Sequence, residues 1–173
     1  MYDYAKSGLT IQQAMVDHVR RFPDKTERPY YILWNDYFVQ TSDELEVPNS
    51  GIVRAEFVSS SLSFQQGFDM KLHGHFLLSD GQKVATLRTW KDDDYEDAVE
   101  YHFDSLDNVM YVWNVCRITY PEGRILEEKW IDNAGFWVER LAPLDRVYHC
   151  SHSIAAPPDF ESLVFRLKVT VAG

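Results

Sequence analysis

Near the N-terminus, hydrophobic and polar residues alternate with the period of an α-helix. Four apolar residues fall on one side of such a helix: Ile11, Met15, Val19 and Phe22. Thr10 followed by Gln13 is a capping-box pattern for the helix start. Pro23 ends the pattern, because proline cannot continue a helix. We therefore expect one amphipathic helix over about residues 10–22, with His18 off the apolar side and in solvent.

From residue 29 onward the pattern is typical of β-strands. Runs rich in aromatic and β-branched residues recur about every ten residues. Short connectors such as 79–82 and 104–108 carry the Gly, Asn or Asp that hairpins need. Apolar and polar residues alternate in the last run, as in a strand with one buried face. After two short strands before residue 41, the predicted strands are 51–63, 68–78, 83–91, 97–103, 108–119, 124–131, 136–141, 145–151 and 162–171.

Sequential strands joined by short hairpins predict an antiparallel up-and-down meander. Because an open twisted sheet leaves exposed edges, we expect the meander to close into a β-barrel over about 29–171. The N-terminal helix would plug one mouth or lie against the wall, within a single domain of residues 1–173. This architecture is similar to that of lipocalin-like (calycin) and fatty-acid-binding barrels, although Trp34 lacks the glycine of the lipocalin Gly-x-Trp signature.

Composition narrows the range of partners. Aromatic residues make up 14% of the chain, and such side chains fill wide interiors or line pockets for apolar ligands. A net charge of −10 argues against nucleic acid and against an anionic membrane surface as partners. The chain shows no signal-peptide pattern and no stretch long enough to span a membrane. We therefore expect a cytoplasmic protein in which Cys116 and Cys150 are free thiols.

Two histidines stand one residue apart in a predicted strand. His73 and His75 would share a face, because side chains two residues apart in a strand point the same way. With Gly67 they resemble part of the first cupin motif, but Asp80 and Leu126 stand where that family has a glutamate and a further histidine ligand. The pair is therefore compatible with a solvated surface, a polar cavity wall that binds a ligand, or a metal site. We expect no metal and no cofactor.

Polar and ionisable residues inside apolar strands indicate a pocket, because charges are rarely buried unless they are paired. Arginine can fix a carboxylate or phenolate, and a buried glutamate can act as a general acid or base. The catalytic candidates are Arg88, Tyr101 and Glu128. The ligand-binding candidates, besides the two histidines, are Tyr111, Trp113 and Arg117. The alternative is an ordinary Arg–Glu pair across neighbouring strands.

No established catalytic motif is present. The sequence contains no nucleophile elbow, phosphate-binding loop, dinucleotide fingerprint or His-Glu-x-x-His helix. The favoured hypothesis is a barrel that binds a small apolar or aromatic molecule, with cofactor-free isomerase, cyclase or lyase chemistry as an extension. An acidic interaction module of the inhibitor or immunity type is the alternative, based on the acidic segments 42–46 and 92–97. A cupin-like metal-binding protein is the second alternative. The oligomeric state is left open, a dimer included.

Overall fold

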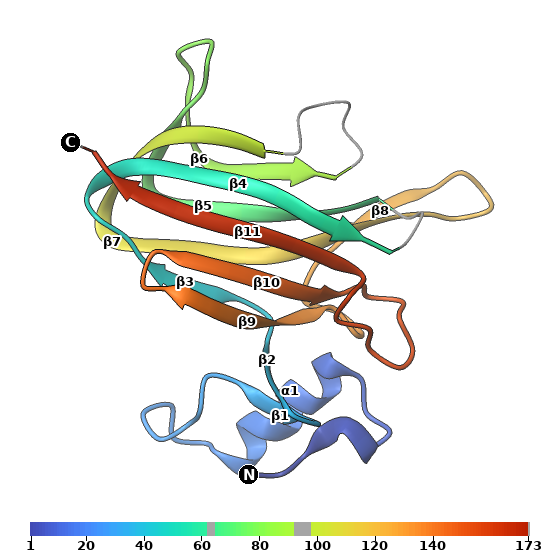
Figure 1. The fold of residues 1–173 in the computed structure, drawn as a ribbon. Coiled ribbons are helices and arrows are strands. Elements are labelled where there is room, and N and C mark those ends of the chain that lie inside the picture. The colour runs from blue at the N-terminus through green and yellow to red at the C-terminus, as the bar shows by residue number, and fades with distance from the viewer. Residues whose placement is uncertain (62–64, 92–97, 173) are drawn as a thin grey trace.

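The computed structural model describes residues 1–61, 65–91 and 98–172. It is mainly antiparallel β-sheet with one α-helix, α1 (Ile11–Arg21), preceded by the short 3-10 helix η1 (Tyr4–Lys6) (Figure 1). Within these residues no helix is long and apolar enough to cross a membrane. The strands are β1 (Ile32–Trp34), β2 (Tyr37–Gln40), β3 (Asp43–Glu46), β4 (Ser50–Ser60), β5 (Gln65–Leu77), β6 (Lys83–Trp90), β7 (Ala98–Thr119), β8 (Ile125–Glu128), β9 (Gly135–Ala142), β10 (Asp145–Ser151) and β11 (Leu163–Val171).

Helix α1 begins with the predicted capping box. The Thr10 side chain accepts from the backbone N–H of Gln13, and the Gln13 side chain accepts from the backbone N–H of Thr10. Its buried side consists of Ile11, Ala14 and His18. The expectation of a solvated His18 is therefore wrong, because its ring Nε2 lies 2.9 Å from the carbonyl oxygen of Pro29. Val19, expected on the buried side, is exposed. Residues three or four apart share one face of a helix, so the sequence pattern is compatible with more than one buried face. Packing against the N-terminal segment determines which face is buried.

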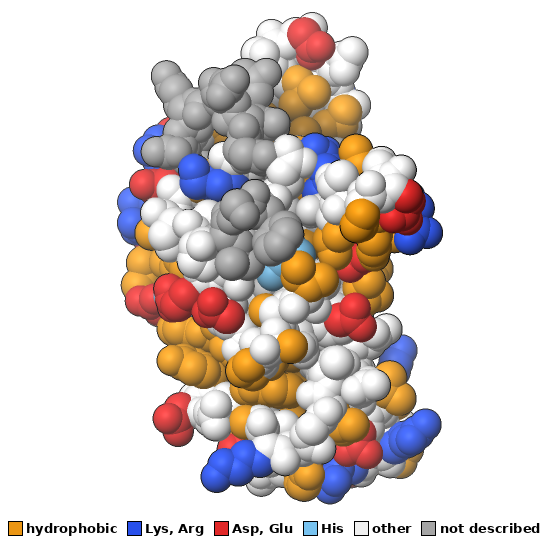
Figure 2. Space-filling model, turned by 90° about the vertical axis from the view of Figure 1, so that its right-hand side faces the viewer, with side chains coloured by type: hydrophobic (Ala, Val, Ile, Leu, Met, Phe, Trp, Pro, Cys, Tyr) orange, Lys and Arg blue, Asp and Glu red, His pale blue; other side chains and the backbone are white. Residues whose placement is uncertain are grey.

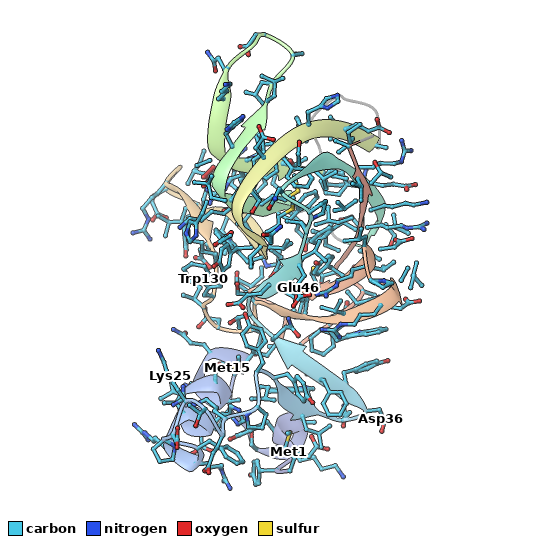
Figure 3. All side chains as sticks on the ribbon, turned by 90° about the vertical axis from the view of Figure 1, so that its left-hand side faces the viewer. Met1, Met15, Lys25, Asp36, Glu46 and Trp130 are labelled. Atoms are coloured by element: carbon cyan, nitrogen blue, oxygen red, sulfur yellow. The ribbon has the colours of Figure 1, made fainter. Side chains whose placement is uncertain are left out.

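Elements η1, α1, β1 and β2 form a small unit below the main sheet (Figures 1 and 3). In Figure 3, Met15 and Lys25 lie in this unit, whereas Glu46 and Trp130 lie on the larger β-structure above it. The unit has its own apolar cluster: Tyr4, Ile11, Ala14, Ile32, Trp34, Val39 and Phe160. Strand β2 pairs with β9, which joins the unit to the main sheet. The helix therefore packs beside β1 and does not enter the interior of the main sheet.

The main sheet is bent at its longest strand. Strand β7 pairs with β4 through its first half and with β3 and β8 through its second half, while β5 follows both halves. Figure 1 shows β7 turning at the left-hand end of the molecule. As a result, a wall of β9, β10, β11 and β4 faces a second wall of β6, β5 and the second half of β7.

The bend replaces a connector that the sequence pattern predicts. Residues 104–108 have turn composition, yet they lie inside β7. Distant partners hold them there: Ser105 N donates to Asn49 O at 2.7 Å, and Val47 N donates to Asn108 O at 2.9 Å. The register with β5 shifts at the same place, as in a β-bulge. Local composition therefore predicts the change of direction but not the continued pairing.

The predicted meander order is wrong, and closure into a barrel is not observed. Along the described chain, the hydrogen-bonded order is β1-β2-β9-β10-β11-β4-β7-β5-β6, and it does not return to its start. The hairpins β5–β6 and β9–β10–β11 follow chain order as expected. Strand β4, however, lies between β11 and β7, because the long β7 supplies edges to both walls.

The core fills the space between the two walls. Phe68, Met70, Leu72 and Phe76 of β5 pack there with Leu163, Phe165 and Leu167 of β11. The rings of Phe68 and Phe165 stack across the interior with centroids 4.0 Å apart. Such stacking adds to the free energy gained from area burial. One face of β5 is thus committed to the core, and its other face must carry the polar residues.

A buried carboxylate links β3 to β10, which have no backbone pairing between them. Asp43 accepts hydrogen bonds from Arg146 Nη1 and from the Tyr148 hydroxyl, each at 2.7 Å, and from Gln40 Nε2 at 3.0 Å. Burial and the negative charge of Asp43 raise the pKa of Tyr148 well above its ordinary value, so the hydroxyl stays a donor. Side chains therefore hold the two walls together where the backbone does not.

Candidate functional site: a cavity at the free edge of β6

A cavity of about 1000 Å³ lies beside β6, at the edge of that strand opposite β5. Four segments line it: residues 55 and 57 of β4, residues 77–80 at the end of β5 and in the turn after it, residues 88–91 at and just after the end of β6, and residues 98–102 at the start of β7. Its volume is at the upper end of the range typical of small-molecule pockets. The cavity therefore opens where the wall of β6 and the wall of β4 are not joined by hydrogen bonds.

The lining combines aromatic and aliphatic side chains with one phenol. Phe57, Trp90 and Val99 supply apolar surface. Tyr101 is half-buried, and burial raises the pKa of its hydroxyl, which keeps it protonated at neutral pH. Its ring contacts Phe76 of the core edge-on at 6.4 Å between centroids. No residue of the described chain forms a hydrogen bond with this hydroxyl, so it can donate to a bound molecule.

Charged side chains surround the cavity. Arg88 belongs to β6, Lys91 follows the end of that strand, and Glu100 and His102 belong to β7. The Lys91 ammonium nitrogen lies 5.8 Å from the centroid of the Phe57 ring, within the range of a cation–π contact. The lining of the cavity therefore combines apolar side chains with charges of both signs.

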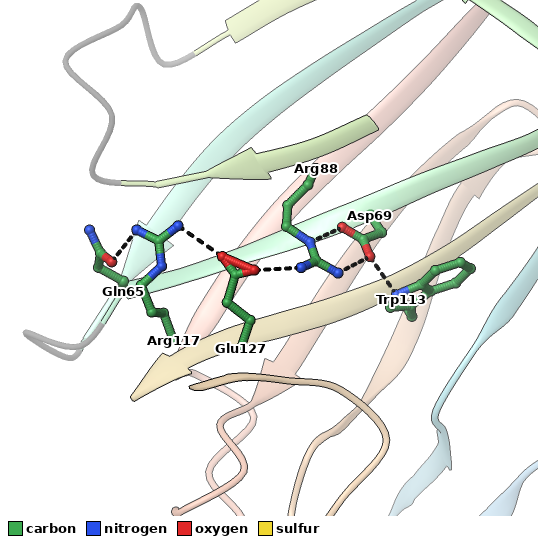
Figure 4. Close-up of polar contacts among 6 residues, drawn as sticks. All are labelled: Gln65, Asp69, Arg88, Trp113, Arg117 and Glu127. Carbon is green, nitrogen blue, oxygen red and sulfur yellow. Dashed lines mark hydrogen bonds and ion pairs between the residues drawn. The ribbon is translucent and has the colours of Figure 1, made fainter. Parts of the chain in front are cut away.

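Arg88 is tied to a buried carboxylate on the outer face of its wall (Figure 4). Its Nε and Nη2 donate to the two carboxylate oxygens of Asp69 at 2.7 and 2.8 Å. Trp113 Nε1 donates to the same carboxylate at 2.8 Å. The three residues stand opposite one another on β6, β5 and β7, and the Asp69 side chain is only 1% exposed. A bidentate, buried pair of this kind fixes geometry more firmly than a surface ion pair.

The network continues across the wall through Glu127 of β8. Glu127 accepts from Arg88 Nη1 at 2.8 Å and from Arg117 Nη2 at 3.0 Å. Hydrogen bonds from Arg117, with a further contribution from Arg88, lower the pKa of Glu127. Arg117 also donates to Gln65 at 2.6 Å and lies over the Trp90 ring at 4.2 Å from its centroid. The charge of Arg88 is thus matched by two carboxylates, and its main role here is to hold β6 in place.

The structure separates the residues that the sequence groups into one pocket. Arg88 and Tyr101 both line the cavity. Trp113 and Arg117 belong instead, with Arg88, to the hydrogen-bonded network on the outer face of the wall, called the outer network below. Tyr111 lies beside His73, with ring centroids 5.4 Å apart. Glu128 points to the opposite side of β8 from Glu127, next to Cys116 of β7, and does not line the cavity.

The two histidines lie on the outer side of β5, away from the cavity. His73 Nδ1 is 2.7 Å from Asp107 Oδ2, and His75 Nε2 is 3.2 Å from Asp104 Oδ2. Both aspartates belong to the bend of β7, so the pairs join β5 to that bend. In residues 1–61, 65–91 and 98–172, no group of three or more histidine, cysteine or acidic side chains is arranged to hold a metal ion.

Three members of the outer network were not among the predicted site residues: Gln65, Asp69 and Glu127. Asp69 has a signal in the sequence, because it interrupts the apolar run of Phe68 and Met70 and faces Arg88 in the predicted hairpin. Glu127 has none. Its neighbour Glu128 fits an alternating strand equally well, and a shift of one residue exchanges the two faces.

Only one of the two acidic segments lies within the described residues. In segment 42–46, Asp43 is buried against Arg146 and Tyr148, so it contributes nothing to a surface patch. Segment 92–97 lies outside the described residues. On the right-hand face, Asp and Glu side chains are interspersed with basic and apolar ones (Figure 2).

Comparison of the chain with protein-family models, with curated proteins and with solved structures finds no match. A function for this chain is therefore inferred from its own site residues.

Proposed function

We propose that this protein binds a small, largely apolar or aromatic molecule in the cavity beside β6. The proposal rests on one combination of features: a cavity of about 1000 Å³, an aromatic lining, and the half-buried hydroxyl of Tyr101. No described residue forms a hydrogen bond with this hydroxyl. Apolar walls with a few polar groups are the usual composition of such sites. The flat part of the ligand would lie against Phe57 and Val99, and an acceptor oxygen would take the hydrogen bond of Tyr101.

Several finer expectations remain part of this proposal. The two facing walls support a calycin-like interior, in which an incompletely joined barrel encloses one ligand. Cofactor-free isomerase, cyclase or lyase chemistry would use Tyr101 as the proton donor, while Arg88, which is bound by Asp69 and Glu127, would hold the wall of the site in place. Cys116 and Cys150 are both free and buried, which is compatible with a cytoplasmic location.

Titration with the neutral naphthalene ketone prodan tests the binding proposal. Prodan is planar, carries one carbonyl acceptor and fluoresces more strongly in apolar surroundings. We expect saturable binding with a stoichiometry of one per chain. Val99→Trp places a large ring in the cavity and should abolish binding, whereas Val58→Trp, on an exposed position of β4, should leave it unchanged. Equal binding by both variants would contradict the proposal, as would the absence of saturable binding by the unmodified protein.

A further inference from the structure

A second group of polar residues lies on the inner face, at the end of the wall that includes β8. Gln66 of β5, Cys116 of β7 and Glu128 of β8 are direct partners across three neighbouring strands. They therefore stand in one row on the same face. Further along β5 this face carries Phe68 and Met70 of the core. The interior is thus apolar through most of its length and becomes polar in this row.

Two acceptor atoms in the row have no hydrogen-bond partner among the described residues. The Gln66 side chain donates through Nε2 to Ser162 O at 2.8 Å, but its Oε1 is buried without a hydrogen bond, and the residue is only 1% exposed. Glu128 Oε2 is likewise buried without one, and its Oε1 receives only a long contact of 3.5 Å from the Tyr120 hydroxyl. A buried acceptor without a hydrogen bond destabilises the folded state, and more strongly when it is charged.

The groups around the row do not supply the missing positive charge. Glu128 forms no ion pair with any residue of the described chain. The ammonium of the adjacent Lys129 lies over the rings of Trp113 and Trp130, on the other face of the wall. Burial lowers the pKa of the nearby His152 to about 4 and raises that of Cys116 to about 11, so both are neutral at pH 7.

Cys116 is the shortest side chain of the row. With strands about 4.8 Å apart, the Cα atoms of Gln66 and Glu128 are separated by about 10 Å. The Cys116 side chain, which is hydrogen-bonded to Ser153, stands between these two longer side chains. Glu128 is half-buried and the following residues are partly exposed, so the row ends near the surface on the β8 side. That side belongs to the right-hand end of the molecule, the face seen in Figure 2.

We propose that this row is a binding site for a protonated primary amine. The ammonium group would place its charge against the Glu128 carboxylate and donate a second N–H to Gln66 Oε1, above the Cys116 thiol. A charged donor is favoured over water because the acceptor at one end of the row is a carboxylate with no cation beside it. Charge-assisted hydrogen bonds are about twice as strong as neutral ones. This site is separate from the cavity, and either proposal can hold without the other.

The test compares ethylammonium chloride with potassium chloride at equal ionic strength. Ethylammonium should raise the thermal unfolding midpoint above the value in potassium chloride, and it should shift the side-chain amide signals of Gln66 in ¹H–¹⁵N spectra. Glu128→Gln should weaken this response about ten-fold or more, which corresponds to the loss of one charge-assisted hydrogen bond. Glu122→Gln, an exposed change on the same β7–β8 hairpin, should retain the full response.

The unmodified protein alone can overturn the proposal. Gln66 amide signals that do not move with ethylammonium, or that move equally with potassium, would do so even if no variant folded. An undiminished response in Glu128→Gln would also overturn it. Stability without any amine gives a second readout: Glu128→Gln should be neutral or stabilising, because it removes an uncompensated charge. Prodan binding should be the same in this variant as in the unmodified protein.

Discussion

Asp69 and Arg88 form a bidentate ion pair across β5 and β6, with distances of 2.7 and 2.8 Å between their donor and acceptor atoms. The carboxylate is almost completely buried, whereas the guanidinium is about one-third exposed. In the described structure β6 pairs with β5 alone, and the cavity lies at its other edge. The pair thus connects the wall of the proposed binding site to the rest of the sheet.

Removing the charge of Asp69 should destabilise the protein strongly. We expect Asp69→Asn to lower the free energy of unfolding by about 3 kcal/mol, because Arg88 and Trp113 lose a shared ionic acceptor inside the structure. Urea unfolding measures the change. Arg54→Gln is the matched control: it breaks an exposed pair with Glu100 and should cost less than about 1 kcal/mol. Equal losses in the two variants would show that the buried Asp69–Arg88 pair stabilises the fold no more than an exposed ion pair does.

Tyr101→Phe tests how the cavity recognises a ligand. The change removes only the hydroxyl, which no described residue engages, so stability should stay within about 0.5 kcal/mol. Affinity for prodan should fall by about five- to ten-fold, the effect of one hydrogen bond to the ligand carbonyl. Fluorescence titration gives both dissociation constants. An unchanged constant would mean that the Tyr101 hydroxyl does not touch the bound molecule.

His152 should make stability depend on pH. Burial lowers its pKa to about 4 from the ordinary 6.5, so the unfolded chain takes up a proton between these values and the folded chain does not. The stability from neutral His152 is complete above pH 6.5 and is lost as the pH falls to about 4, a change of about 3 kcal/mol.

His152→Asn isolates this effect from other titrations. Asparagine keeps an acceptor for the Ile154 N–H that His152 Nδ1 now accepts at 3.2 Å. The difference in free energy of unfolding between the unmodified protein and this variant should change by about 3 kcal/mol between pH 7 and pH 4. Urea titrations at several pH values measure it. A difference that is the same at all pH values would show that His152 is protonated equally in both states.

Tyr148→Phe should weaken the link between β3 and β10. Asp43 would lose the donor at 2.7 Å and keep those of Arg146 and Gln40. Since the lost bond is buried and made to a carboxylate, we expect a loss of about 2 kcal/mol in the free energy of unfolding. Amide hydrogen exchange should quicken first in residues 43–46. Uniform quickening throughout the chain would contradict a local role for this bond.

Local patterns predict the parts of this fold that depend on neighbours in sequence. The capping box of Thr10 and Gln13 and the alternation of Leu163, Phe165 and Leu167 are both confirmed. In these cases the chain segment itself contains the interacting residues or shows which face is buried. Alternation also puts His73 and His75 on the face of β5 opposite Phe68, but only the packing of the core shows that the Phe68 face is the inner one.

Features that depend on distant partners are not visible in the sequence. Residues 104–108 continue a strand because Val47 and Asn49 bond to them from another part of the chain. Glu127, and not Glu128, reaches Arg88 because pairing with β7 sets the register of β8. A change of one residue in that register exchanges the two carboxylates between the outer network and the inner row. The candidate residues that the sequence places in a single pocket lie in different places because the register of these strands is defined only by the three-dimensional structure.

The most direct test of the binding site is to map a prodan titration onto the chain by ¹H–¹⁵N spectra. We expect the largest chemical-shift changes at the backbone amides of Phe57, Val99 and Tyr101 and at the indole N–H of Trp90, all of which line the cavity. Amides of the outer histidine pairs and of helix α1 should stay in place. Shifts concentrated on the N-terminal unit, or spread evenly over the exposed surface, would contradict the proposal that this cavity is the binding site.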